Sequence, residues 1–199
     1  MQPALDDQTR YTYRDYLTWP EDVRYELIDG RPYLMAPAPT LEHQDIAGEI
    51  YRQLGNILEG KPCRPYIAPV DVLLPKEDEA NEEIDTIVQP DVLVVCDPSK
   101  LQRRGIRGAP DFVVEVLSPS SAYHDHQRKR EVYERAGVKE YWLVDPIERM
   151  ILVYRLDDQG RYGKPEVWDM AGETPVSILP EVRIQWDSLM ERLPPREDQ

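Results

Sequence analysis

The sequence predicts an α/β protein with a mixed sheet, in which a helix, three strands, a second helix and a further strand form the core and short β elements flank both ends. Three patterns predict this order: helical periodicity over residues 40–60, three proline-bounded β-rich runs between residues 65 and 119, and a second helical stretch after them. The 199 residues suffice for one domain, 1–199, and we expect its core at about 40–156.

The N-terminal part predicts a short helix followed by a β-hairpin. Thr12 and Asp15 have the spacing of a capping box, which is typical of a helix start. Residues 23–37 then alternate apolar and polar side chains around Asp29 and Gly30, a residue pair that favours a tight hairpin turn.

The first long helix is expected between residues 40 and 60. Thr40 is suited to the N-cap, and Ile46, Ile50 and Leu54 recur at helical spacing. Gly60 ends the pattern, because glycine is common just beyond a helix.

The runs 65–75, 89–97 and 109–119 predict the three central strands. The mostly acidic stretch 76–85 predicts a solvated loop or hairpin tip between the first two. The segment 98–108 predicts a loop between the second and third runs. GIRGAP at 105–110 is interpreted as part of the loop that leads into the third run, because its glycines lack the strand-to-helix context of a phosphate-binding motif.

Beyond these strands the chain predicts a helix over 125–136, which Gly137 ends. A strand pair over 140–146 and 149–156 follows it. Further short strands and a terminal helix near 186–193 complete the expected order.

Composition sets limits on the function. The net charge of −14 argues against a general affinity for nucleic acid, because phosphate binding requires clustered Lys and Arg. No apolar run of about 18 residues is present and the N-terminus lacks the layout of a secretory signal, so we expect no membrane association and a cytoplasmic location. Cys63 and Cys96 fit no zinc motif, and we interpret both as small buried residues.

The charge is unevenly distributed, since bases outnumber acids between residues 100 and 139. Arg103, Arg104, Arg107 and Arg128 are therefore candidates for contacts with nucleic-acid phosphates. A role in solubility and loop charge is an equally open interpretation of these four residues.

Three carboxylates mark the predicted central strands. Glu115 interrupts an apolar run, and a buried carboxylate requires a partner. Asp91 begins the preceding run and Asp71 lies near the end of the first. If the strands pair as consecutive antiparallel neighbours, the three side chains meet at one edge, where oxygen ligands suit Mg²⁺ or Mn²⁺.

Lys129 shares a helix face with Val132 and Tyr133, so we expect its ammonium to point inward. An inward lysine needs an anionic neighbour, and Glu115 is the obvious one. Two interpretations stay open: a pair with a catalytic role, or a buried ion pair without chemistry.

Asp71, His43 and Glu26 are second-rank candidates. Asp71 can simply reach solvent at a strand end, and His43, on the apolar face of the first helix, is either a ligand or a satisfied core histidine. Glu26 is equally consistent with the polar face of the hairpin. The serines after Glu115 lack a G-x-S-x-G elbow, which argues against a serine nucleophile.

With Asp91, Glu115 and Lys129 in this order, the chain resembles the PD-(D/E)XK nuclease superfamily, which has a restriction-endonuclease-like core, and QPD at 89–91 resembles its PD element. YELIDG, His43, QPDVLVVCDPSKL, GAPDFVVEVLSPSS and AGVKEYWLVDP more narrowly resemble the bacterial family of restriction-endonuclease candidates often labelled Uma-two. The resemblance extends over roughly residues 10–190.

The resemblance implies that Asp91 and Glu115 bind Mg²⁺ or Mn²⁺ and that Lys129 helps to position or activate the attacking water. It also implies a homodimer and DNA as the substrate. The superfamily lysine would stand two residues after Glu115, where this chain has Leu117, so the lysine has moved to the following helix.

We therefore expect a metal-dependent endonuclease that hydrolyses phosphodiester bonds of DNA. The alternative is a catalytically inactive protein of nuclease fold with a binding or regulatory role, which the net charge favours mildly.

Overall fold

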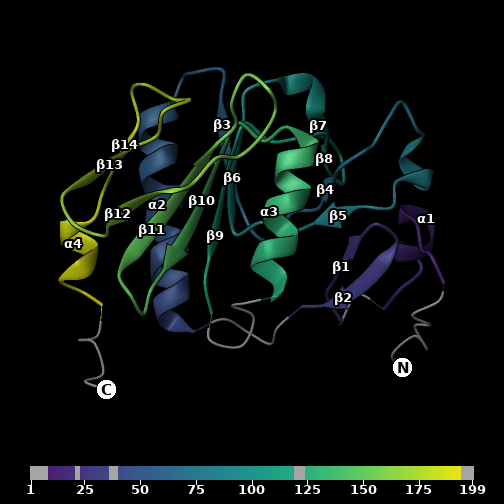
Figure 1. Ribbon diagram of the computed structural model, residues 1–199, viewed down its shortest axis with the longest axis horizontal. Coiled ribbons are helices and arrows are strands. Elements are labelled where there is room, and N and C mark those ends of the chain that lie inside the picture. The colour runs from purple at the N-terminus through teal and green to yellow at the C-terminus, as the bar shows by residue number, and fades with distance from the viewer. Residues whose placement is uncertain (1–8, 21–22, 36–39, 119–123, 194–199) are drawn as a thin grey trace.

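The computed structural model describes residues 9–20, 23–35, 40–118 and 124–193 (Figure 1). The central sheet has the order β12 (Glu166–Asp169), β11 (Met150–Arg155), β10 (Glu140–Asp145), β9 (Phe112–Val116), β6 (Val92–Val95), β3 (Arg64–Ile67). The second sheet has the order β2 (Arg31–Leu34), β1 (Tyr25–Ile28), β5 (Ile87–Val88), β4 (Val72–Leu73), β8 (Gly105–Arg107), β7 (Leu101–Gln102).

The middle of the central sheet has the predicted order of elements. Helix α2 (Leu41–Leu58) precedes β3, and β3, β6 and β9 are consecutive antiparallel neighbours. Helix α3 (His124–Ala136) then leads to β10, which pairs with β9 in parallel. The sheet is therefore mixed, as expected.

The two long helices cover opposite faces of the central sheet (Figure 1). Val92 and Val114 pack in the core that α2 covers, whereas Leu93 and Val113 pack with Tyr133 of α3. Successive strand residues point to opposite faces, so both faces of β6 and β9 are buried. This double cover explains why these strands read as continuous apolar runs.

Helix α2 begins as its sequence predicts. The Thr40 side chain accepts a hydrogen bond from the backbone N–H of His43 at 3.2 Å. Ile46, Ile50 and Leu54 are fully buried against the central sheet. The N-cap thus fixes where the helix starts, and the apolar face fixes which residues point toward the strands.

The N-terminal hairpin also follows its sequence. Helix α1 (Tyr13–Tyr16) starts at the predicted capping box of Thr12 and Asp15. Asp29 and Gly30 have φ of 50° and 74°, the left-handed conformation that a tight turn between twisted strands requires. Strand β1 pairs with both β2 and β5, and the hairpin is thereby part of the second sheet.

The predicted strand 65–75 is in fact two strands in different sheets. Strand β3 pairs with β6, whereas β4 pairs with β5 and β8. The predicted GIRGAP loop is likewise wrong, because it contains β8. Gly105 has φ of 143°, and a Cβ there would lie 2.4 Å from the Asp71 carbonyl oxygen, so the close approach of β8 requires glycine.

The C-terminal part packs on α2, with β13 (Glu173–Pro175), β14 (Arg183–Gln185) and α4 (Asp187–Met190). The Gln53 side chain donates to the Gln185 carbonyl and accepts from the Gln185 N–H, each at 2.8 Å. The remaining short helices are η1 (Asn81–Glu83) and η2 (Pro98–Lys100). No helix within the described ranges has the length and apolar character needed to cross a membrane.

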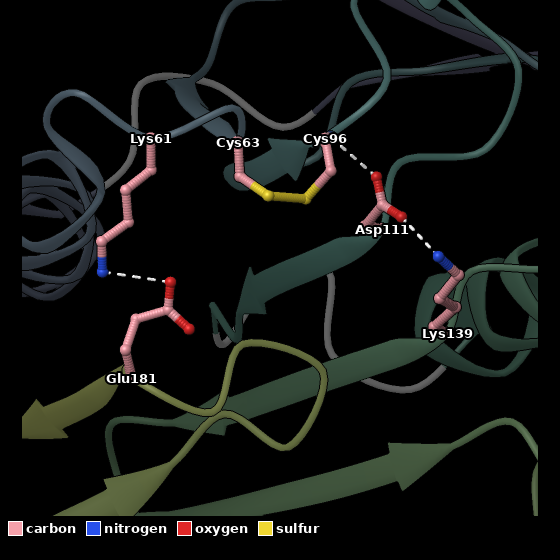
Figure 2. The surroundings of a disulfide bond; sticks show 6 residues. All are labelled: Lys61, Cys63, Cys96, Asp111, Lys139 and Glu181. Carbon is pink, nitrogen blue, oxygen red and sulfur yellow. Dashed lines mark hydrogen bonds and ion pairs between the residues drawn. A yellow bond between two sulfur atoms is a disulfide. The ribbon is translucent and has the colours of Figure 1, made fainter.

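Cys63 and Cys96 form a disulfide, so the expectation of two free buried thiols is wrong (Figure 2). They flank the paired residues Arg64 and Val95 and therefore face each other across β3 and β6. The Cys96 N–H donates to the Asp111 carboxylate at 2.8 Å. Spacing could not predict this bond, because the residues are 33 positions apart and only strand pairing brings them together.

Replacement of Cys63 and Cys96 together by Ser should lower the free energy of unfolding by about 2–4 kcal/mol, because the disulfide restricts the unfolded chain. Urea unfolding under non-reducing conditions measures the difference. A thiol reductant should produce the same decrease in the wild type and none in the double variant. Equal unfolding midpoints for the two oxidised proteins would contradict the expectation.

Candidate functional site

The site is built around an ion pair between Glu115 of β9 and Lys129 of α3. The Lys129 Nζ lies 2.9 Å from Glu115 Oε1, and the two residues are 8% and 5% exposed. The Tyr133 hydroxyl donates to the same Oε1 at 2.6 Å. Lys129 and Tyr133 are one helical turn apart, so α3 presents both donors to the carboxylate that β9 places beneath it.

A second carboxylate shares the lysine. Glu26 Oε1 of β1 lies 2.9 Å from Lys129 Nζ and accepts a hydrogen bond from the Gln89 N–H at 2.8 Å. Glu26 is buried, not on a polar face, because both faces of β1 are covered. The lysine therefore bridges the second sheet and the central sheet.

Asp91 lies beside Glu115, at the start of the neighbouring strand. It precedes Val92, which pairs with Val114 in the antiparallel register, so Asp91 falls opposite Glu115. Its Oδ2 accepts from the Val116 N–H at 2.8 Å and lies 3.2 Å from His43 Nε2. The antiparallel pairing expected from the sequence thus brings these two carboxylates together.

The pKa shifts follow from burial and charge. Burial raises the pKa of Glu115 to about 7, because the Lys129 charge only partly offsets the burial and the nearby charges of Asp91 and Glu26. Burial alone would lower the pKa of Lys129, but Glu115 and Glu26 raise it above its ordinary value. Lys129 therefore stays an ammonium.

Asp91 and His43 form the other charged pair of the site. Burial would raise the pKa of Asp91, but the hydrogen bond and charge of His43, with the Val116 N–H, hold it below its ordinary value. Burial would lower the pKa of His43, and Asp91 and Glu115 raise it instead. Asp91 is consequently an ionised carboxylate held in one orientation.

The donor set fits a hard divalent cation. Within the described residues, the hydrogen bonds to the two carboxylates use Oδ2 of Asp91 and Oε1 of Glu115. The second oxygens of these carboxylates are the candidate metal ligands. No group of three or more His, Cys, Asp or Glu side chains in the described part of the chain is arranged to hold a metal ion. Mg²⁺ fits such a pair, because it commonly takes one or two carboxylates and completes its shell with water and phosphate oxygens.

Asp71 does not join this pair, contrary to the expected three-carboxylate edge. It stands between β3 and β4, where the chain leaves the central sheet. Its Oδ1 accepts from the Tyr16 hydroxyl at 3.1 Å and the Gln89 side chain at 2.8 Å. The structure thus gives Asp71 a place in a neighbouring polar network.

The four predicted phosphate-binding arginines have different surroundings. Arg107 donates to Asn81 and to the Glu79 carbonyl in the acidic loop. Arg128, adjacent to Lys129 on α3, lies over the Tyr33 ring at 4.7 Å. Arg103 and Arg104 are exposed in the turn between β7 and β8. Only Arg128 stands on an element that also supplies the buried ion pair.

Residues 13–187 match the family Uma2, described as "Putative restriction endonuclease". The chain belongs to the Uma2 family. It is 30% identical to the uncharacterised protein slr1290 of Synechocystis sp. over 149 residues, which cover 73% of this chain and 74% of that protein. This confirms the resemblance that the central motifs indicated.

The fold is similar to the crystal structure of a "putative nuclease belonging to DUF820" from Anabaena variabilis. The TM-score is 0.70 at 22% identity, and the likeness covers 90% of this chain and 97% of that one. In this Uma2 chain the position two residues after Glu115 is Leu117, whose N–H donates to the Val144 carbonyl at 2.8 Å. The ammonium beside Glu115 comes from α3 instead.

Two features of the site lay outside the sequence expectations. Gln89 donates its N–H to Glu26 and its side chain to Asp71, and Tyr133 donates to Glu115. Tyr133 could have been found, because it follows Lys129 by four residues on the same helix face. Nothing in the sequence indicated that Gln89 belongs to the site, apart from its position directly before the PD element.

Lys129→Met should lower the free energy of unfolding by about 3–5 kcal/mol near pH 8, because the buried carboxylates of Glu26 and Glu115 lose the ammonium that pairs with them. The loss should shrink toward about pH 5.5: an acid with a raised pKa binds more protons in the native state, and protonation removes the unpaired charge. Urea unfolding at both pH values measures this.

The variant Glu115→Gln combined with Lys129→Met is the matched control. It removes one of the unpaired carboxylates and should recover part of the lost stability near pH 8. An equal loss for Lys129→Met at both pH values would contradict a buried charge as the cause.

Proposed function

We propose that this Uma2 protein is a metal-dependent endonuclease that hydrolyses phosphodiester bonds of DNA, with a restriction-endonuclease-like core. One observation carries the proposal: two carboxylates, Asp91 and Glu115, lie side by side on neighbouring strands with the Lys129 ammonium 2.9 Å from one of them. Membership of a family described as "Putative restriction endonuclease" supports it.

Asp91 and Glu115 would hold Mg²⁺ or Mn²⁺ through their second oxygens, Oδ1 and Oε2. When bound, the cation would polarise the scissile phosphate and lower the pKa of a bound water. His43 and the Val116 N–H hold Asp91 in place, and the Tyr133 hydroxyl holds Glu115. These contacts orient both carboxylates before any ligand arrives.

Lys129 would stabilise the negative charge that develops on the phosphate during hydrolysis. A fixed ammonium in a buried site is more effective than one in water, since it needs no reorganisation as the charge develops. Its raised pKa ensures that the positive charge is present.

The alternative is an inactive protein of nuclease fold with a binding or regulatory role. A specific observation favours it: Lys129 Nζ lies 2.9 Å from each of two carboxylates, an arrangement that a buried ion-pair network without chemistry also has. The two functions differ in their response to metal, because only a working site gains stability from Mg²⁺ or Mn²⁺.

Asp91→Asn should reduce cleavage of plasmid DNA with Mn²⁺ by on the order of 100-fold or more, because it removes a metal-binding charge. We also expect Mn²⁺ to raise the melting temperature of the wild type and not that of Asp91→Asn. Asp169→Asn on β12, an exposed position, is the matched control and should behave as the wild type. Cleavage by Asp91→Asn at the wild-type rate would refute the proposed nuclease site.

Arg128→Ala should weaken DNA binding and reduce the slope of log affinity against log salt concentration by about 1, because one phosphate contact is lost. Arg107→Ala should leave that slope unchanged, since Arg107 is engaged by the acidic loop. Fluorescence anisotropy with labelled duplex in Ca²⁺, over a salt series, compares the two. A larger change of slope for Arg107→Ala than for Arg128→Ala would contradict this assignment.

A further inference from the structure

Glu26 contributes a buried charge to the site from outside the core elements. It lies in β1, in the second sheet, and is 6% exposed. Its Oε1 lies 2.9 Å from Lys129 Nζ, the same distance as Glu115 Oε1. The Lys129 ammonium is thus shared evenly by Glu115, which would bind the metal ion, and Glu26, which comes from the other sheet.

That sharing has a consequence when a divalent cation binds. If Asp91 and Glu115 held a divalent cation, part of the Glu115 charge would be balanced by it, and Glu115 would attract the Lys129 ammonium less strongly. A buried ammonium that loses its partner is strongly unfavourable. Glu26 would then be the carboxylate that balances the charge of Lys129. Glu26 belongs to the second sheet and is not a strand neighbour of Asp91.

Glu26 is also connected to the strand that carries Asp91. Its Oε1 accepts the N–H of Gln89, two residues before Asp91, at 2.8 Å. One carboxylate oxygen therefore fixes both the ammonium and the backbone that leads into β6. A displacement of Glu26 would alter the position of Lys129 relative to Asp91.

The hairpin also contacts α3 outside this buried ion pair. Asp29 in the β1–β2 turn forms an ion pair with Arg135 of α3 at 2.9 Å. Arg128 of α3 lies over the Tyr33 ring of β2. Two contacts nearer the surface therefore join hairpin and helix, and Asp29 can be changed to test that junction without touching the buried carboxylate.

We propose that Glu26 is a positioning residue that keeps Lys129 beside the scissile phosphate while Glu115 binds the metal ion. The proposal rests on the proposed nuclease function and deepens it. It makes the N-terminal hairpin part of the catalytic unit, because the charge opposite Lys129 comes from β1.

The test compares Glu26→Gln with Asp29→Asn in the full chain, by plasmid cleavage at saturating Mn²⁺. Gln at position 26 still accepts the Gln89 N–H but lacks the charge. We expect kcat to fall on the order of 10-fold to 100-fold with little change in KM, because the ammonium is misplaced. Asp29→Asn breaks an exposed hairpin contact with the same helix and should cleave as the wild type.

A double-variant cycle distinguishes positioning from a structural role. If Glu26 acts through Lys129, Glu26→Gln should cause no further loss of kcat in a Lys129→Met background. A full additional loss in that background, or wild-type kcat for Glu26→Gln alone, would overturn the role of Glu26 and leave the proposed function standing. No cleavage by the wild type would overturn both.

Two further measurements keep the test decisive if Glu26→Gln is unstable. Circular dichroism establishes whether the variant is folded at the assay temperature. If it is not, Glu26→Asp replaces it. The shorter side chain keeps the negative charge but holds it farther from Lys129. The kcat should therefore fall in the wild-type background and stay constant in the Lys129→Met background. Equal effects in both backgrounds would overturn the proposal.

Discussion

The ammonium of Lys129 is the group on which the arrangement of the site depends. It is buried and it contacts one carboxylate from each of the two sheets. Each of these three charges would be strongly unfavourable alone, so none of the elements that carry them can move without exposing or unpairing the others. The second sheet, the central sheet and α3 are therefore fixed to one another at this group of buried charges.

The central part of this arrangement could be predicted from the sequence. Glu115 in an apolar strand demanded a partner, and the helical spacing of Lys129 with Val132 and Tyr133 placed that partner on the inward face. Antiparallel pairing of the strands then put Asp91 beside Glu115, as the register shows. Local periodicity was sufficient to place Glu115 and Lys129, because both helices pack directly on these strands, whereas the position of Asp91 also required the expected antiparallel pairing.

The remaining members of the site depend on long-range pairing that local patterns do not encode. Glu26 alternates with apolar residues as a polar-face residue would. It is buried because both faces of β1 are covered and Lys129 of α3 lies against it. Asp71 lies outside the expected group of carboxylates because the chain crosses to the second sheet between β3 and β4. The count of charges along the chain also could not show that Arg107 and Arg128 have different surroundings. Arg107 donates to the acidic loop, whereas Arg128 lies over the Tyr33 ring.

The disulfide has a topological consequence. Residues 63–96 form a covalent ring that contains β3 and β6 of the central sheet and β4 and β5 of the second sheet. The acidic segment between β4 and β5, with exposed residues such as Glu77 and Asp78, lies within this ring. A protease that cuts there would leave both fragments joined through sulfur, and the cut chain would separate into two pieces only after reduction.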